Sequence, residues 1–439
     1  MPSLRDAHLR HAKHFLNVIW EASKLCEQGG DKFHRGSASF DRALDNIREA
    51  QLWASHNASQ DKEADALCSN FPDAGGYLVD LRLHPQERIA WQKAGLSSAR
   101  RLRDRNAERT HLNNLGLTHF ALGQPLLAAE SHQAAMSIHR DLGDLRGQAC
   151  SLNNIGMCHA ATGSPKEAVT LFSQSLALCR DNGDLNGQWS ALNNLGLAYA
   201  DLGEHRTAIE SHKQGIMVAR ERGDFRREAT ALGNLGLSFA ALGDYPRAVE
   251  CYDEQLTIAR DIADVHTEAN ALTNLGVAHR RLGDANRALQ IHERSLTLFG
   301  SFGDLRGKGT VLGNIGLDLV ALGDFRRALE FLKMDLKISR EVRNRREEGT
   351  ALGNLGVVHK KCGDIKRAIE CYRQQLALAR DTNDQGSEGR ALWNMSLLFE
   401  RGGNRIQAIR CAQVALRIFD LIESPEKRMV RTALALWNA

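Results

Sequence analysis

The chain repeats itself every 40 residues. The segment ALGNLGLSFAALGDYPRA starts at Ala231, and related segments start at His111, Ser151, Ala191, Ala271, Val311, Ala351 and Ala391. These eight copies follow one another without insertion or deletion. A fixed period of this length is typical of solenoids, in which each unit packs on its neighbours. The length of 439 residues also excludes one compact core, because single cores stop growing near roughly 250–300 residues.

Three columns of the repeat never vary. The Gly column runs from Gly123 to Gly403 and the Ala column from Ala128 to Ala408, both in steps of 40 residues. The Asn column consists of Asn114, Asn154, Asn194, Asn234, Asn274, Asn314, Asn354 and Asn394.

Each unit predicts two antiparallel helices, so the chain is expected to be all-α. The Gly column suits the left-handed residue that follows a helix end. The second helix, for example 246–261, has apolar residues at helical spacing and begins near the Ala column, where a methyl group permits close helix packing. The first helix is expected to be capped by Asp144, Asp184, Asp224, Asp264, Asp304, Asn344 or Asp384.

The pattern N-L-G-x-x-[FYH]-x-x-x-G-[DEN]-x-x-x-A resembles the tetratricopeptide repeat, with matches at Leu235, Gly236, Phe239, Gly243 and Ala248. The usual unit has about 34 residues. Units of 40 residues with an NLG core are similar to those of Pins-type spindle-orientation adaptors and of many bacterial tetratricopeptide proteins. The resemblance covers about residues 85–420. It implies a right-handed α-solenoid, a superhelix whose first helices line a concave groove.

The repeat also predicts the domain organisation. Residues 85–423 form the array, with a degenerate half unit at 85–103 followed by the eight full units. Residues 424–439 are expected to form a capping helix, whose Val430, Leu434, Leu436 and Trp437 would cover the last repeat. Residues 1–84 lack the period and are predicted to be a separate helical region.

Part of residues 1–84 resembles the segment that precedes the repeat array in STAND signal-transduction ATPases of the NB-ARC type. The matching residues are His11, Ala12, Phe15, Leu16, Asp45, Asn46, Ile47, Ala50, Trp53 and Ala54. The nucleotide-binding half of those proteins is absent from this chain. The resemblance therefore implies that an ATPase would be supplied by another chain or by a removed part.

No pattern of an enzyme is present in the sequence. The nearest approach to a phosphate-binding loop, 303–310, has the wrong spacing and is one copy of the turn between repeats. His132, His212 and His292 share a column with Phe172 and Tyr252, which indicates packing rather than metal binding. We expect no catalytic residue, no metal and no cofactor.

Composition narrows the partner and the compartment. A formal net charge of +4 and 6% aromatic residues argue against nucleic-acid binding. No stretch is apolar enough to span a membrane, and no signal peptide is visible. The 9 cysteines include no CxxC pair, so they are expected to be reduced thiols in a cytoplasmic protein.

The expected partner site is the groove. In the family, the Asn column faces a bound peptide, and an amide supplies the donor and acceptor that a peptide bond needs. Alternatively, the Asn side chains tie each repeat to the next. Basic residues near the groove would pair with a partner's acids, or they are solvated helix ends. The predicted groove residues are Asn194, Asn234, Asn274, Asn314, Asn354, Arg280, Arg281, Lys360 and Lys361.

Two functions follow from this sequence. The first is a non-catalytic scaffold that binds a protein or peptide, expected to carry acidic residues, in the concave groove. The alternative is the ligand-sensing domain of a STAND-type ATPase whose nucleotide-binding part is not in this chain. The sequence leaves open the identity of the partner and the oligomeric state.

Overall fold

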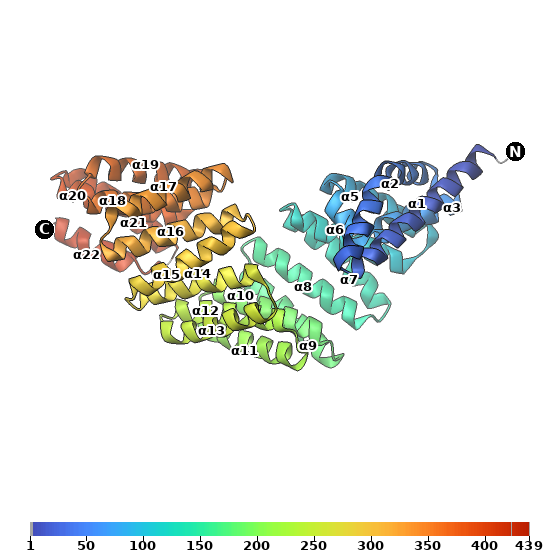
Figure 1. Cartoon of the computed structure of the whole chain (residues 1–439), viewed down its shortest axis with the longest axis horizontal. Coiled ribbons are helices and arrows are strands. Elements are labelled where there is room, and N and C mark those ends of the chain that lie inside the picture. Colours follow the sequence, from blue (N-terminus) through green and yellow to red (C-terminus); the bar gives the residue numbers. More distant parts are fainter. Residues whose placement is uncertain (1–2, 423, 439) are drawn as a thin grey trace. The chain divides into compact units, whose positions relative to one another are not determined.

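The computed structural model describes residues 3–422 and 424–438, and these residues form helices joined by short turns, without a strand (Figure 1). The chain divides into two compact units. Unit 1 ends at Arg222, and unit 2 begins at Gly223. The predicted boundary at residue 423 and the last residue of the predicted capping helix, 439, lie outside the described residues.

Unit 1 contains five helices before the first full repeat and six helices in the first three repeats. The five helices are α1 (Leu4–Glu27), α2 (Gly30–Asn57), α3 (Lys62–Ala74), α4 (Gly76–Arg82) and α5 (Pro85–Leu102). The six helices are α6 (Arg105–Ala121), α7 (Pro125–Asp141), α8 (Leu145–Ala161), α9 (Pro165–Asp181), α10 (Leu185–Asp201) and α11 (His205–Glu221).

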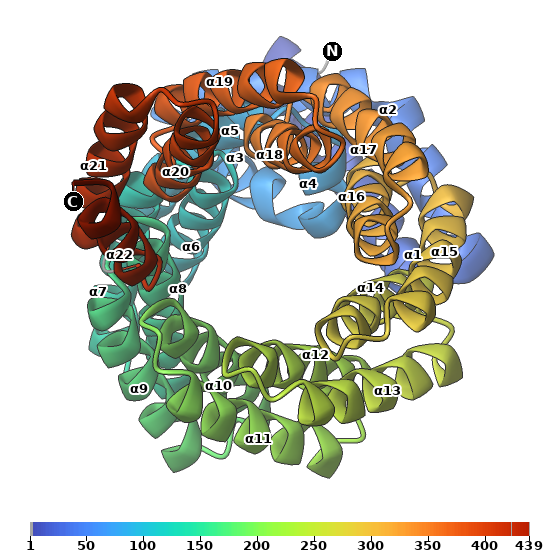
Figure 2. The same ribbon diagram turned by 90° about the vertical axis from the view of Figure 1, so that its left-hand side faces the viewer.

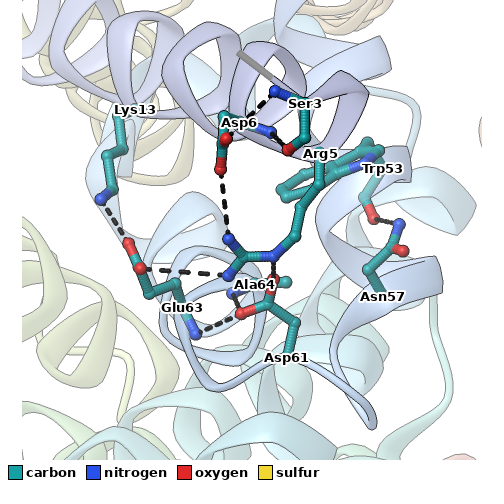
Figure 3. A network of polar contacts seen from close by, with 9 residues as sticks. All are labelled: Ser3, Arg5, Asp6, Lys13, Trp53, Asn57, Asp61, Glu63 and Ala64. Carbon is teal, nitrogen blue, oxygen red and sulfur yellow. Dashed lines mark hydrogen bonds and ion pairs between the residues drawn. The ribbon is translucent and has the colours of Figure 1, made fainter. Parts of the chain in front are cut away.

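Ion pairs join the N-terminal half of α1 to the start of α3 (Figure 3). The Arg5 guanidinium donates to Asp61, with 2.6 Å between Nε and Oδ2, and Lys13 lies 2.5 Å from Glu63. Asp61 also caps α3 by accepting the backbone N–H of Glu63. Below this polar edge, α1, α2 and α3 bury one apolar core that includes Ile19 and Phe40.

Unit 2 contains the last five repeats and one further helix. The first helices of these repeats are α12 (Phe225–Ala241), α14 (Val265–Arg281), α16 (Leu305–Leu322), α18 (Arg345–Lys361) and α20 (Gln385–Arg401). The second helices are α13 (Tyr245–Asp261), α15 (Ala285–Ser301), α17 (Phe325–Glu341), α19 (Ile365–Asp381) and α21 (Arg405–Leu421), and α22 (Lys427–Asn438) follows.

The capping residues and the turns agree with the sequence prediction. Asp224 accepts the backbone N–H of Arg227, Asp264 accepts that of Thr267, and the predicted caps of the other repeats bond in the same way. Every glycine of the Gly column has a positive φ, between 70° and 92°. An L side chain is strained there, so this column ends each first helix at a fixed residue.

Close packing of the two helices of a repeat depends on a second glycine, the one in the NLG motif. A Cβ atom on Gly236 would lie 2.5 Å from the Tyr252 ring, and one on Gly356 would meet Tyr372 at the same distance. In the last repeat the glycine is replaced by the larger Ser396, and the aromatic residue opposite it is replaced by the small and fully buried Ala412. The Ala column, also fully buried, keeps the start of the second helix equally close.

The repeats of unit 2 form two layers of helices. In unit 2, successive first helices contact each other directly, as α12 does α14 and α14 does α16. Helices α13, α15, α17 and α19 each pack between the first helices before and after them. The first helices therefore form the inner layer of a curved array and the second helices the outer layer, as Figure 2 shows for α14, α16 and α18 inside α15, α17 and α19.

Helix α22 packs against α21 at the end of unit 2. Val430 and Leu434 are buried as predicted, and the Trp437 ring stacks on Trp393 with 5.9 Å between ring centroids. Leu436 differs from the prediction, because it is 69% exposed. Its backbone carbonyl instead accepts a hydrogen bond from the Arg405 guanidinium. Among the residues described, no helix combines the length and apolarity needed to cross a membrane.

Candidate binding face

The inner face of unit 2 is the exposed surface of its first helices, α12, α14, α16, α18 and α20. An apolar stripe follows this face, one turn after the Asn column. Leu237 is 50% exposed, and the stripe continues with the partly exposed Val277, Leu317, Val357 and Leu397. Apolar side chains that remain accessible beside polar amides suit contact with a partner.

Part of the Asn column ties successive helices together. The Asn114 amide donates to Asp73 at 3.1 Å, and the Asn194 amide in unit 1 donates to Asn153 at 3.0 Å. In both cases the acceptor lies 41 residues earlier in the chain. The tie that was the alternative interpretation of this column therefore exists at these two positions.

Asn274 and Asn354 differ from the tied residues. The residue 41 positions earlier is Gly233 for Asn274 and Gly313 for Asn354, so neither amide has a side chain there to bond. Both are partly buried on the inner layer, and neither side chain forms a hydrogen bond with the described part of the chain. Each of the two amides can therefore offer both its donor and its acceptor to a ligand. Asn234 is also partly buried, on α12.

Arg280 has its partners within unit 2. Its guanidinium lies 2.8 Å from the carboxylate of Asp318 and also donates to the backbone and side-chain oxygens of Asn314. His292 lies 2.5 Å from the other oxygen of Asp318. The side chains of Asp318 and His292 are fully buried, and that of Arg280 is 14% exposed. Arg280 and Asn314 are thus already paired with each other rather than open to a partner.

The remaining basic residues form a positive cluster at the end of α18. Burial lowers the pKa of Lys360, and the neighbouring charges of Lys361 and Arg401 lower it further. None of these three forms an ion pair with the described residues, and the same holds for the exposed Arg281 on α14. Partly desolvated like charges repel one another, so an anion placed among them is stabilised.

Sequence reasoning missed Asp318, which decides the role of Arg280. A signal was present. The other residues of its column are small or apolar, namely Thr118, Cys158, Ala198, Ser238, Ala278, Val358 and Leu398. A single acid in such a column needs a buried partner.

The sequence argued against metal binding and phosphate binding, and no site for either is seen in the described residues. Among them, no three His, Cys, Asp or Glu side chains are grouped to hold a metal ion. At the loop 303–310, the Asp304 carboxylate accepts the backbone N–H groups of Arg306 and Gly307 that a phosphate would need. Burial lowers the pKa of His132 and His212 to about 4, so both are neutral packing residues.

The family model described as "Tetratricopeptide repeat" matches most of the array. It aligns with six stretches, of which the first five overlap: residues 106–181, 147–221, 187–261, 227–301, 267–341 and 347–420. No curated protein is significantly similar to the chain in sequence.

Several solved structures are similar in fold. The STAND protein with a tetratricopeptide repeat sensor from Pyrococcus horikoshii has 12% identity and a TM-score of 0.57, over 96% of this chain and 65% of that chain. The apo form of the quorum sensor NprR from B. thuringiensis has 13% identity and a TM-score of 0.54, over 86% of this chain and 99% of that chain. Aspartyl phosphate phosphatase F from Bacillus subtilis has 11% identity and a TM-score of 0.55, over 86% of this chain and 95% of that chain. Identities this low show a shared fold and nothing more.

Proposed function

The chain belongs to the tetratricopeptide repeat family, and from this premise we propose that the inner face of unit 2 binds a protein or peptide segment that carries acidic residues. Tetratricopeptide repeat domains generally bind proteins or peptides. The observation that carries the proposal is the cluster of Lys360, Lys361 and Arg401, three cations without an acidic partner in the described residues.

The amides of Asn274 and Asn354 supply the second half of the site. They lie on first helices two repeats apart, and the apolar stripe runs beside them. A segment bound along this face would exchange hydrogen bonds with the two amides through its main chain and place apolar side chains on the stripe. Its acidic side chains would reach the cations of α18 and α20. Arg281, at the end of α14, extends the positive charge toward the first of these amides.

The test begins with peptides selected from a random display library on the intact chain. We expect the selected peptides to be enriched in Asp and Glu. Their association with the double variant Lys360→Glu/Lys361→Glu should be slower, and its dependence on salt concentration should be weaker or reversed. Stopped-flow measurement of the association rate over a series of salt concentrations gives both quantities.

A matched control uses two lysines of the outer layer. Lys337 on α17 and Lys366 on α19 are exposed, so Lys337→Glu/Lys366→Glu changes the net charge by the same amount. The proposal requires the control to keep most of the association rate. Equal slowing by both double variants would mean that only the net charge of the chain matters, and selected peptides without acidic enrichment would contradict the proposed partner.

A second candidate function is that of a sensor domain in a STAND-type system. The likeness to the Pyrococcus horikoshii STAND protein extends over 96% of this chain, including the helices before the array. Residues 1–84 also carry the NB-ARC-type resemblance, with His11 on α1 and Trp53 on α2. In this case the bound segment would be the signal, and an ATPase elsewhere would respond to it.

The two candidates differ in one measurement. An ATPase encoded beside this gene, mixed with the purified chain, should change its rate of ATP hydrolysis when a selected peptide is added. An unchanged rate, while the peptide still binds, would support the scaffold and reject the sensor.

A further inference from the structure

A small polar cavity lies in unit 1, where α3, α4, α5 and α6 meet. It has a volume of about 150 Å³. Its polar wall is formed by Asp73 on α3, Asp80 on α4, Arg88 and Gln92 on α5, and Thr110 and Asn114 on α6. This is room for several water molecules, and therefore for the end of a peptide chain.

Among the described residues, no cation forms an ion pair with the Asp73 carboxylate at pH 7. It accepts one hydrogen bond from the Asn114 amide, at 3.1 Å. The ring of His111 lies 3.5 Å away, but burial lowers the pKa of His111 to about 4, so this ring is neutral at pH 7. Burial raises the pKa of Asp73 itself to about 7. A positive group in the cavity would therefore bind the ionised carboxylate and lower its pKa.

The one arginine of the cavity wall is already used. Arg88 forms an ion pair with Asp80 and donates to the hydroxyl group of Thr118, at 3.3 Å. These two charges cancel. When Asp73 is ionised, the three charged groups of the wall carry one net negative charge, so the cavity favours a cation over an anion.

Gln92 shows that the cavity also offers a donor. Only 4% of this residue is exposed. Its side-chain oxygen accepts from Thr118 at 3.3 Å, whereas its Nε2 donates to none of the described residues, so the acceptor for this N–H₂ group must come from the cavity that Gln92 lines. Water in the cavity can accept from this N–H₂ group, and a bound carbonyl oxygen can take the place of that water.

We infer that this cavity binds the N-terminal α-ammonium group of a peptide together with its first carbonyl oxygen. The ammonium lies against the Asp73 carboxylate and the side-chain oxygen of Asn114, and the carbonyl accepts from Gln92. A free amino acid shares this chemistry but carries an extra carboxylate, which the ionised Asp73 repels. The cavity lies in unit 1 and would bind a cationic group, whereas the face proposed in unit 2 would bind acidic groups. The two proposals can therefore be tested independently.

The probe is triglycine amide, titrated into the full-length chain by isothermal calorimetry near pH 7.4. We expect saturable binding that weakens at least about tenfold in Asp73→Asn and in Gln92→Met. Affinity should fall below pH 7 as Asp73 takes up a proton. It should also fall above pH 8, because a peptide α-amino group loses its proton with a pKa of about 7.7–8.0.

Three further ligands and one control variant complete the test. N-acetyl triglycine amide lacks the ammonium, ethylammonium lacks the carbonyl, and free glycine carries a carboxylate; each should bind at least about tenfold more weakly than triglycine amide. Asp45→Asn removes an exposed carboxylate of α2 and should bind like the parent chain. Asp73→Asn should fold normally, because it removes a charge without a counter-charge, and circular dichroism checks this. The inference is overturned by absent saturable binding, by equal binding of the acetylated peptide or of glycine, or by unchanged affinity in Asp73→Asn.

Discussion

Arg280 and Arg281 are adjacent in the sequence and have different roles in the structure. Arg280 neutralises the fully buried Asp318, whereas Arg281 is exposed and makes no ion pair with the described residues. Removal of one partner from a buried pair leaves an uncompensated charge. Arg280→Met should therefore lower the free energy of unfolding of unit 2 by about 3–5 kcal/mol. Arg281→Met should change it by less than about 0.5 kcal/mol.

Urea unfolding followed by helicity gives both values. Equal losses in the two variants would mean that Asp318 is compensated by His292 alone.

Asp335 predicts a pH dependence of stability. It is 4% exposed, it accepts a hydrogen bond from Ser339, and burial raises its pKa to about 7. In the unfolded chain an Asp titrates near about 3.9, so the folded chain binds the proton more tightly. The contribution of Asp335 to the free energy of unfolding must therefore fall as pH rises from about 4 to about 7.

Asp335→Asn should remove this part of the pH dependence. We expect the variant to match the parent chain near pH 4 and to exceed it by on the order of 1–3 kcal/mol at pH 8. Urea unfolding at several pH values measures the difference. A difference that stays constant with pH would show that Asp335 does not titrate in this range.

The Asn column shows what a sequence can and cannot predict about single residues. Its identical residues allowed both a tie between repeats and a ligand contact. The structure shows where the tie forms: the residue 41 positions earlier is Asp73 for Asn114 and Asn153 for Asn194, but Gly233 for Asn274. The ligand contact remains a prediction. The sequence contains the identity of the residue 41 positions earlier. Its importance could be recognised only after the structure showed which columns of adjacent repeats are in contact.

The helices and their ends were predicted well at the scale of elements, because caps and turns are local. Asp224 and Asp264 act as predicted, and the Gly column ends each first helix. Two of the three glycines within α18, Gly349 and Gly356, have different surroundings, and only packing distinguishes them. A Cβ on Gly356 would overlap the Tyr372 ring, whereas a Cβ on Gly349 would meet nothing within 4 Å.

These two glycines give a matched pair of variants. Gly356→Ala should destabilise unit 2 by about 1–3 kcal/mol, because it overpacks the contact between α18 and α19. Gly349→Ala should stabilise it by up to about 1 kcal/mol, because alanine has the higher helix propensity. Thermal unfolding by circular dichroism compares them. If both variants lose stability, the space beside Gly349 is not open.

At the scale of the whole molecule, the 40-residue period predicted an all-α solenoid of antiparallel helix pairs, and the fold and the family match confirm it. The period did not predict the division into two units after Arg222, because the repeat continues through this point without interruption. The predicted domain boundaries and groove residues remain predictions. Among those residues, the structure favours Asn274, Asn354, Lys360 and Lys361 over the already paired Arg280 and Asn314.

The most direct test of the proposed binding face compares two double variants with one acidic peptide selected on the parent chain. Asn274→Ala/Asn354→Ala removes two inner-layer amides, and Gln290→Ala/Gln374→Ala removes two exposed amides from α15 and α19 of the outer layer. Fluorescence anisotropy gives the dissociation constants. Because each hydrogen bond contributes about 0.5–1.5 kcal/mol, we predict about tenfold weaker binding for the inner variant, unchanged binding for the outer variant and little change in the melting temperature of either. Equal affinity of both variants for the peptide would contradict the account.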